Sequence, residues 1–171
     1  MNAIKIRIIA VLLLLFTINE CVLFSSRFRS KDPFYQSSGE REYLRIPLIQ
    51  PYEAIKGNDQ EGWSIDLVAS PSEEATYYIS IKGAEEIVIQ GGIVYVYTSY
   101  VEESAIGLEH KILHWFVLDA EKGFEKGFEN ESDFLEYISK YNVGELNWAN
   151  LDELFEQYEK TGCLDWVPDC E

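Results

Sequence analysis

The two histidines are the first residues to consider for chemistry, because imidazole is a common metal ligand and general base. His110 and His114 lie four residues apart in EHKILHW, directly after Glu109. On a helix this spacing would let both rings share a metal ion. The valine and aromatic residues that follow favour a strand, on which such residues are about 13 Å apart. We therefore expect no metal site and no cofactor.

Carboxylates are abundant, but their spacing favours a solvated surface. The adjacent pairs Glu85–Glu86 and Glu102–Glu103 would point to opposite faces of a strand. NDQEG and ENESD lack the spacing and central glycine of a calcium loop. The chain contains no serine-hydrolase elbow, Walker loop, zinc-protease motif or dinucleotide fingerprint. We expect no catalytic residue, and an enzyme or accessory factor with a carboxylate-lined cleft is the alternative.

The three cysteines fall into one near the N-terminus and two near the C-terminus. Cys163 and Cys170 flank LDWVPD, in which Pro168 bends the chain. In an oxidising compartment they are expected to form a disulfide, which requires Cα atoms within about 7 Å. That pairing would leave Cys21 alone. Three unconnected thiols in a reducing cytoplasm are the alternative, and a zinc site lacks a second pair of ligands.

A basic start and an apolar run predict that the N-terminal segment is exported or attached to a membrane. Lys5 and Arg7 precede the run 8–18, which has the length of a signal-peptide core. The segment resembles a bacterial lipoprotein signal, in which a leucine-rich run precedes a cysteine that receives lipid. The resemblance implies Cys21 as the lipidation candidate.

Other interpretations of this segment remain open. Cleavage after Ser25 would make residues 1–25 an ordinary signal peptide. An uncleaved anchor helix over 8–24 would have the minimum length for a membrane span. Glu20 departs from the lipoprotein pattern, which has a small residue before the cysteine. A buried core element is the last alternative. The lipoprotein signal, the cleaved signal peptide and the uncleaved anchor all predict a membrane-associated, cell-envelope or extracytoplasmic protein.

Composition divides the rest of the chain into two parts. Residues 26–42 are polar and contain serine, glycine and proline, which predicts a linker. Residues 43–171 hold every strong periodic pattern, which predicts a single globular domain. The tandem KGFE at 122–129 is too short for a repeat fold and indicates a turn-rich connection between strands.

Within this domain, strand patterns come first and helical patterns follow. Alternating apolar and polar residues indicate strands, with a hairpin at glycines 91–92. Helical spacing follows at 133–141, and again from the N-cap Asn150 to Gly162. This order predicts an α+β fold with an antiparallel sheet of about five to six strands. Two C-terminal helices are expected to pack on one face of the sheet.

The charge of the chain restricts its partners. It carries 14 basic and 30 acidic side chains, a net charge of −16. Residues 119–171 hold 15 acidic side chains and 4 lysines, which gives −11. Nucleic acids and anionic lipid headgroups would be repelled by such a surface. A basic protein partner is favoured instead, because opposite charge speeds association.

Exposed tyrosines complete the list of candidate residues. Strand alternation places Tyr78, or one of Tyr95 and Tyr97, on an outward sheet face, where tyrosine is typical of binding surfaces. The expected function is a non-enzymatic, membrane-tethered or exported acidic domain that binds a protein, as an inhibitor or immunity protein does. A structural component of the cell envelope is the second alternative.

Overall fold

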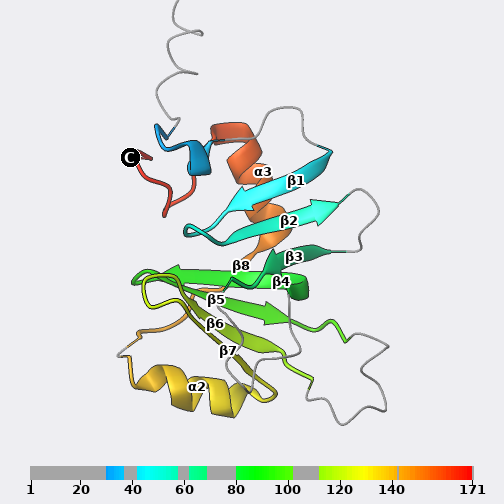
Figure 1. Ribbon diagram of the computed structural model, residues 1–171, viewed down its shortest axis with the longest axis vertical. Coiled ribbons are helices and arrows are strands. Elements are labelled where there is room, and N and C mark those ends of the chain that lie inside the picture. The colour runs from blue at the N-terminus through cyan, green and yellow to red at the C-terminus, as the bar shows by residue number, and fades with distance from the viewer. Residues whose placement is uncertain are drawn as a thin grey trace, which may run out of the picture.

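The computed structural model describes residues 30–36, 42–57, 62–68, 80–101, 112–141 and 143–170. These ranges form one antiparallel sheet, two α-helices and a short 3-10 helix (Figure 1). The strands are β1 (Tyr43–Pro47), β2 (Glu53–Gly57), β3 (Trp63–Asp66), β4 (Ser80–Gln90), β5 (Ile93–Thr98), β6 (Trp115–Asp119), β7 (Phe124–Phe128) and β8 (Ala149–Asn150). The helices are η1 (Pro33–Tyr35), α2 (Glu131–Ser139) and α3 (Leu151–Thr161). The α+β class with an antiparallel sheet is therefore confirmed.

The sheet has more strands than the five to six expected. Strands β1 to β7 lie side by side in sequence order, and each pairs with the next. β7 lies within the tandem KGFE that was expected to be a turn-rich connection. Gly127 lets it approach its neighbours, because a Cβ there would lie 2.4 Å from Cδ1 of Leu113. β7 therefore depends on contacts with other segments, which its own composition does not reveal.

The two α-helices pack on opposite faces of the sheet, so the expectation of one shared face is wrong. Val94 and Val96 of β5 belong to the hydrophobic cluster that includes Leu151 and Leu154 of α3. Tyr95, which points the other way, belongs to the cluster that includes Phe134 of α2. Alternate residues of one strand therefore serve two cores.

β8 explains how the chain crosses from one face to the other. β4 is eleven residues long, and its first part pairs with β3 from Ser80 to Ala84. β8 pairs with the next part, at Glu86 and Ile87, on the side that β3 leaves. The chain thus leaves α2, adds two residues to the sheet edge, and enters α3 on the other face (Figure 1).

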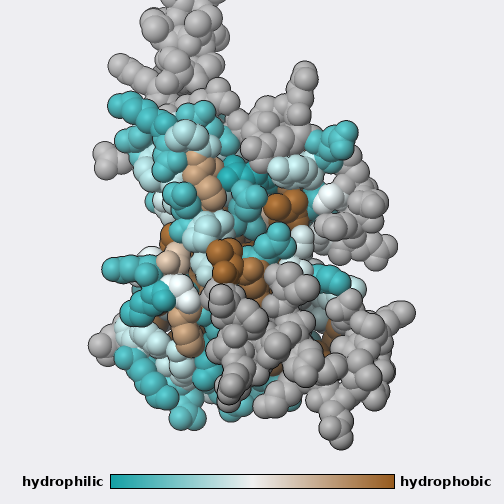
Figure 2. All heavy atoms as spheres, viewed as in Figure 1, coloured by the Kyte–Doolittle hydropathy of each residue, from teal (hydrophilic) through white to brown (hydrophobic). Residues whose placement is uncertain are grey.

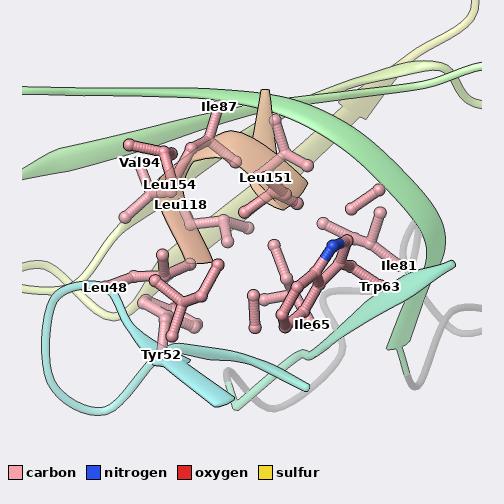
Figure 3. Close-up of a cluster of buried hydrophobic side chains, with 14 of the residues drawn as sticks. Leu48, Tyr52, Trp63, Ile65, Ile81, Ile87, Val94, Leu118, Leu151 and Leu154 are labelled. Atoms are coloured by element: carbon pink, nitrogen blue, oxygen red, sulfur yellow. The ribbon is translucent and has the colours of Figure 1, made fainter. Parts of the chain in front are cut away.

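The larger core lies between the curled sheet and α3. Figure 3 shows side chains from the β1–β3 part, including Leu48 and Ile65, facing Ile87 and Leu118 from the β4–β6 part. Leu151 of α3 lies among them and is fully buried. Each such residue contributes about 1.5–3 kcal/mol relative to an exposed position. This core holds the β1–β3 part of the sheet against the rest of the domain.

Part of the predicted linker belongs to the folded domain. Tyr35 is 9% exposed and joins the larger core. The Tyr158 hydroxyl of α3 donates to the Tyr35 carbonyl at 2.7 Å, and Arg45 donates to the Phe34 carbonyl at 2.8 Å. The predicted boundary at residue 43 therefore misses a docked segment, because two aromatic residues outweigh the polar average around them.

The predicted anchor, the run 8–18 and Cys21 lie outside the described residues. None of the helices in the described ranges combines the length and the apolar character needed to cross a membrane.

Candidate functional site

Of the three tyrosines proposed from strand alternation, the structure describes Tyr95 and Tyr97. Tyr95 is 1% exposed and packs edge-on against Phe134 of α2, with ring centroids 6.1 Å apart, so its assignment as a surface residue is wrong. Tyr97 is half-buried and contacts Trp115 at 5.4 Å. Tyr78 lies outside the described residues. Of the two described positions, only Tyr97 reaches the surface, and only in part.

The Tyr95 hydroxyl is a buried polar group that finds no hydrogen-bond partner in the described part of the chain. Burial raises the pKa of Tyr95, and the nearby Tyr141 and Asp119 raise it further. The phenol therefore stays neutral near neutral pH.

The two C-terminal cysteines form a disulfide in this structure. The Cα atoms of Cys163 and Cys170 are 5.5 Å apart, within the limit that the pairing requires. The loop follows Gly162, whose φ of 69° ends α3 in the left-handed conformation. Trp166 Nε1 donates to the Pro47 carbonyl at 2.9 Å, which attaches the loop to β1. The disulfide thus closes a loop that Trp166 attaches to β1.

His114, the histidine that the structure describes, contacts the backbone of β5 and an aromatic ring of β6. His114 Nδ1 lies 2.8 Å from the Thr98 carbonyl oxygen, and its ring meets Trp115 edge-on at 5.7 Å. His110 lies outside the described residues. Among the residues that the structure describes, no group of three or more His, Cys, Asp or Glu side chains is placed to hold a metal ion.

A cluster of aromatic and lysine side chains is the most distinctive surface feature of the described structure. It is built on β7, on α2 and on the residues at their ends. We call it the aromatic face, and its members are Phe124, Phe128, Tyr137, Tyr141, Lys122, Lys126 and Lys140. Phe124 is 38% and Tyr141 40% exposed, so the cluster reaches the surface.

Secondary-structure periodicity places these side chains together. Phe124, Lys126 and Phe128 alternate along β7, so they point to the sheet face that α2 covers. Tyr137 lies in the last turn of α2 and Tyr141 lies two residues beyond its end, and their rings are in contact. The tandem KGFE was the available signal, because a four-residue repeat on a strand returns each phenylalanine to one face.

Three aromatic rings surround Tyr137, one nearly parallel to it and two tilted. Its centroid lies 5.2 Å from Phe128, 5.5 Å from Tyr141 and 6.3 Å from Phe124, with the Phe124 ring nearly parallel. The Tyr137 and Tyr141 hydroxyls are 2.9 Å apart. Such ring pairs are worth about 0.5–1.5 kcal/mol beyond their buried area. These contacts hold partly exposed rings in a fixed geometry.

Lysine ammonium groups lie over these rings. Lys126 Nζ is 4.6 Å from the Tyr137 centroid and 5.3 Å from that of Phe128. Lys140 Nζ lies 5.8 Å from the Tyr137 centroid, and Lys122 Nζ lies 5.5 Å from that of Tyr141. All four distances fall within the range of cation–π attraction.

Asp119 supplies a buried negative charge beside this cluster. Its side chain is 7% exposed and accepts from Lys122 Nζ at 2.8 Å and from the Lys122 backbone N–H at 3.0 Å. Burial alone would raise the pKa of Asp119, but the hydrogen bonds from Lys122 outweigh it and lower the pKa. The same contact raises the pKa of Lys122. Both groups are therefore charged near neutral pH.

The surroundings of the aromatic face remain acidic. Residues 119–141 hold 7 acidic side chains and 3 lysines, a net charge of −4. On the side of the molecule drawn in Figure 2, hydrophilic residues predominate among those described, and hydrophobic ones lie in small groups. Exposed aromatic rings within an acidic surface are a feature of the site.

Comparison of the chain with protein-family models, with curated proteins and with solved structures found no match.

Proposed function

We propose that this chain is a non-enzymatic, acidic protein-binding domain, exported or held at a membrane by its N-terminal segment. The observation that carries the proposal is the aromatic face, where Phe124 and Tyr141 stay exposed although both contact Tyr137. Aromatic side chains dominate the binding energy of many interfaces, because they bury much area and lose little conformational freedom. Rings already fixed by contact with one another lose still less on binding.

The charge of the chain supports a basic partner. A net charge of −16 attracts a cationic protein over distances comparable to the Debye length, about 8 Å at physiological salt. The aromatic face lies within a region whose own net charge is −4. Inhibitor and immunity proteins use this combination of long-range attraction and short-range packing, and we place the chain in that class by physical analogy.

The position of the aromatic face suits a tethered domain. Residues 30–36, which follow the N-terminal segment, dock beside the C-terminal loop at one end of the molecule (Figure 1). Helix α2 lies at the opposite end in the same view. If the N-terminal segment is attached to a membrane, α2 lies at the end of the domain farther from the attachment, where a partner can reach the aromatic face.

Site-specific photocrosslinking in the native cells tests the proposal. A benzophenone amino acid would replace Phe124 in the full-length chain, and Leu44 of β1 would be the control. The two positions match in exposure, at 38% and 39%. We expect a discrete protein adduct from position 124 and none from position 44. Equal adducts from both positions, or none from position 124, would contradict the proposal.

Fractionation of the same cells tests the tether. The full-length chain is expected in the membrane or extracytoplasmic fraction, and mass spectrometry of its N-terminus separates lipid, cleaved signal and uncleaved helix. Recovery in the cytosol with Met1 intact would refute this part.

A further inference from the structure

We infer that the aromatic face contains a binding site for a cationic side chain of the partner, an arginine or a lysine. In this site Lys126 and Lys140 are place-holders that occupy the ring of Tyr137 until the partner binds. The inference rests on the proposed function and specifies the chemistry of the group that is recognised.

The first step is that the rings already bind cations. Two separate lysines, one from β7 and one beyond the end of α2, direct their ammonium groups to the same Tyr137 ring. A third lysine reaches Tyr141. Three lysines make four such contacts within residues 122–141, so the rings of the aromatic face already lie within cation–π distance of ammonium groups.

The second step is that the place-holders are replaceable. Lys140 is exposed, and Lys126 is partly exposed on the surface of the sheet. A lysine ammonium at an exposed position gains only about 0.5–1 kcal/mol from a ring, and it is strongly hydrated. A guanidinium is planar and more weakly hydrated, so it stacks better on an aromatic ring. Displaced lysines return to water at little cost.

The third step is that the wider region around the rings carries a net negative charge, although lysines lie against the rings themselves. The Asp119 carboxylate acts on Tyr137 and contributes to raising its pKa, after burial and the Tyr141 hydroxyl. Because its pKa is raised, the Tyr137 hydroxyl stays neutral and remains hydrogen-bonded to the Tyr141 hydroxyl. The net charge of residues 119–141 is −4. An anionic ligand would have to approach against this charge.

The test is a titration of the full-length chain, purified in a neutral detergent and labelled with 13C at tyrosine. The probe is the peptide acetyl-Gly-Arg-Gly-Arg-Gly-Arg-amide, with sodium chloride at equal ionic strength as the blank. We expect the probe to shift the ring signals of Tyr137 and Tyr141, which Tyr137→Phe and Tyr141→Phe assign. Shifts confined to other tyrosines would overturn the inference.

The decisive comparison uses two double variants of equal charge. Lys126→Gln/Lys140→Gln removes the place-holders, and Lys31→Gln/Lys160→Gln removes two exposed lysines at the other end of the fold. Both lower the net charge by two. We expect the first to bind the probe about three- to tenfold more tightly than the second. Equal or weaker binding by the first would refute a place-holder role.

An acidic probe separates the opposite mechanism. Acetyl-Gly-Glu-Gly-Glu-Gly-Glu-amide should leave both tyrosines unshifted. If it binds at Tyr137 and the Lys126→Gln/Lys140→Gln variant abolishes that binding, the lysines form an anion site and the inference is wrong. A crosslinked partner at position 124 without arginine recognition would leave the proposed function intact and remove the inference alone. If the peptide probe binds at Tyr137 but position 124 crosslinks no partner, the cation site stands and the proposed protein-binding function is removed.

Discussion

Replacing Tyr35 with alanine is expected to destabilise the domain by about 3 kcal/mol, although the sequence places this residue in a linker. Truncation of a buried aromatic side chain costs about 3–5 kcal/mol. Tyr35 is 9% exposed and lies at the margin of the larger core, which favours the lower limit. The Tyr158 hydroxyl bonds to the Tyr35 backbone carbonyl, so the substitution removes packing and leaves this hydrogen bond in place.

Thermal and urea unfolding of the full-length chain, followed by circular dichroism, would measure the effect. For a domain of this size, 3 kcal/mol lowers the melting temperature by about 10 °C. Leu44→Ala is the control, because Leu44 lies on the neighbouring β1 and is 39% exposed. We expect it to cost less than about 1 kcal/mol. If Tyr35→Ala changes the unfolding free energy by less than 0.5 kcal/mol (roughly the effect of a surface substitution), residues 30–36 are not part of the folded unit.

Three further predictions concern buried groups. Tyr95→Phe removes a hydroxyl that has no partner in the described structure, so it is expected to raise the unfolding free energy by up to about 1 kcal/mol. Tyr52→Phe should lower the unfolding free energy by about 1–3 kcal/mol, because the Tyr52 hydroxyl bonds to Glu125 at 2.9 Å. Urea unfolding compares the two variants, and stabilisation by Tyr52→Phe would be inconsistent with that bond. Reduction of the disulfide should lower stability by about 2.5 kcal/mol for so short a loop, measured as a shift of the urea midpoint in dithiothreitol, and an unchanged midpoint would show that the bond constrains nothing. The lowered pKa of Asp119 stabilises the fold at pH values above the ordinary aspartate pKa, and this stabilisation is lost as the pH falls through the lower pKa of the folded state. Asp119→Asn should therefore flatten the acid side of a curve of unfolding free energy against pH. A curve parallel to that of the wild type would contradict the assignment.

Local patterns in the sequence predict the fold class, because the signals involved act within a few residues. Asn150 Oδ1 accepts hydrogen bonds from the Asp152 and Glu153 backbone N–H groups, and Gly162 ends α3 with a positive φ. The paired glycines 91–92 form the expected hairpin, with φ values of 61° and 80°. Caps and tight turns are set by side chains next to them in sequence.

The arrangement of the elements could not be predicted in the same way. Each helix took its own face of the sheet because β8 pairs with the part of β4 beyond β3, and no local pattern encodes that pairing. The two-sided cover also explains the error at Tyr95. Five of the six residues of β5 are buried, so alternation on that strand separates two cores and leaves neither face for solvent.

The aromatic face was also hidden in the sequence, since it joins β7 to α2 and β7 was not expected to be a strand. The repeated phenylalanines at 124 and 128 could have been assigned to one face only after that strand was known. The helical spacing predicted at 133–141 includes Tyr137 and Tyr141, but it does not indicate that they would meet side chains of β7. Tyr141 is exposed because it lies just beyond the end of α2.

The account depends most on the claim that the aromatic face binds a protein partner. The most direct test is the dissociation constant of the partner crosslinked at position 124, measured with purified full-length chains carrying Phe124→Ala, Tyr141→Ala or the control Leu44→Ala. The account predicts that each aromatic substitution weakens binding by about tenfold or more, as loss of 1.4 kcal/mol at an interface hot spot requires. The control should bind like the wild type. Dissociation constants that agree across all four proteins would contradict the account.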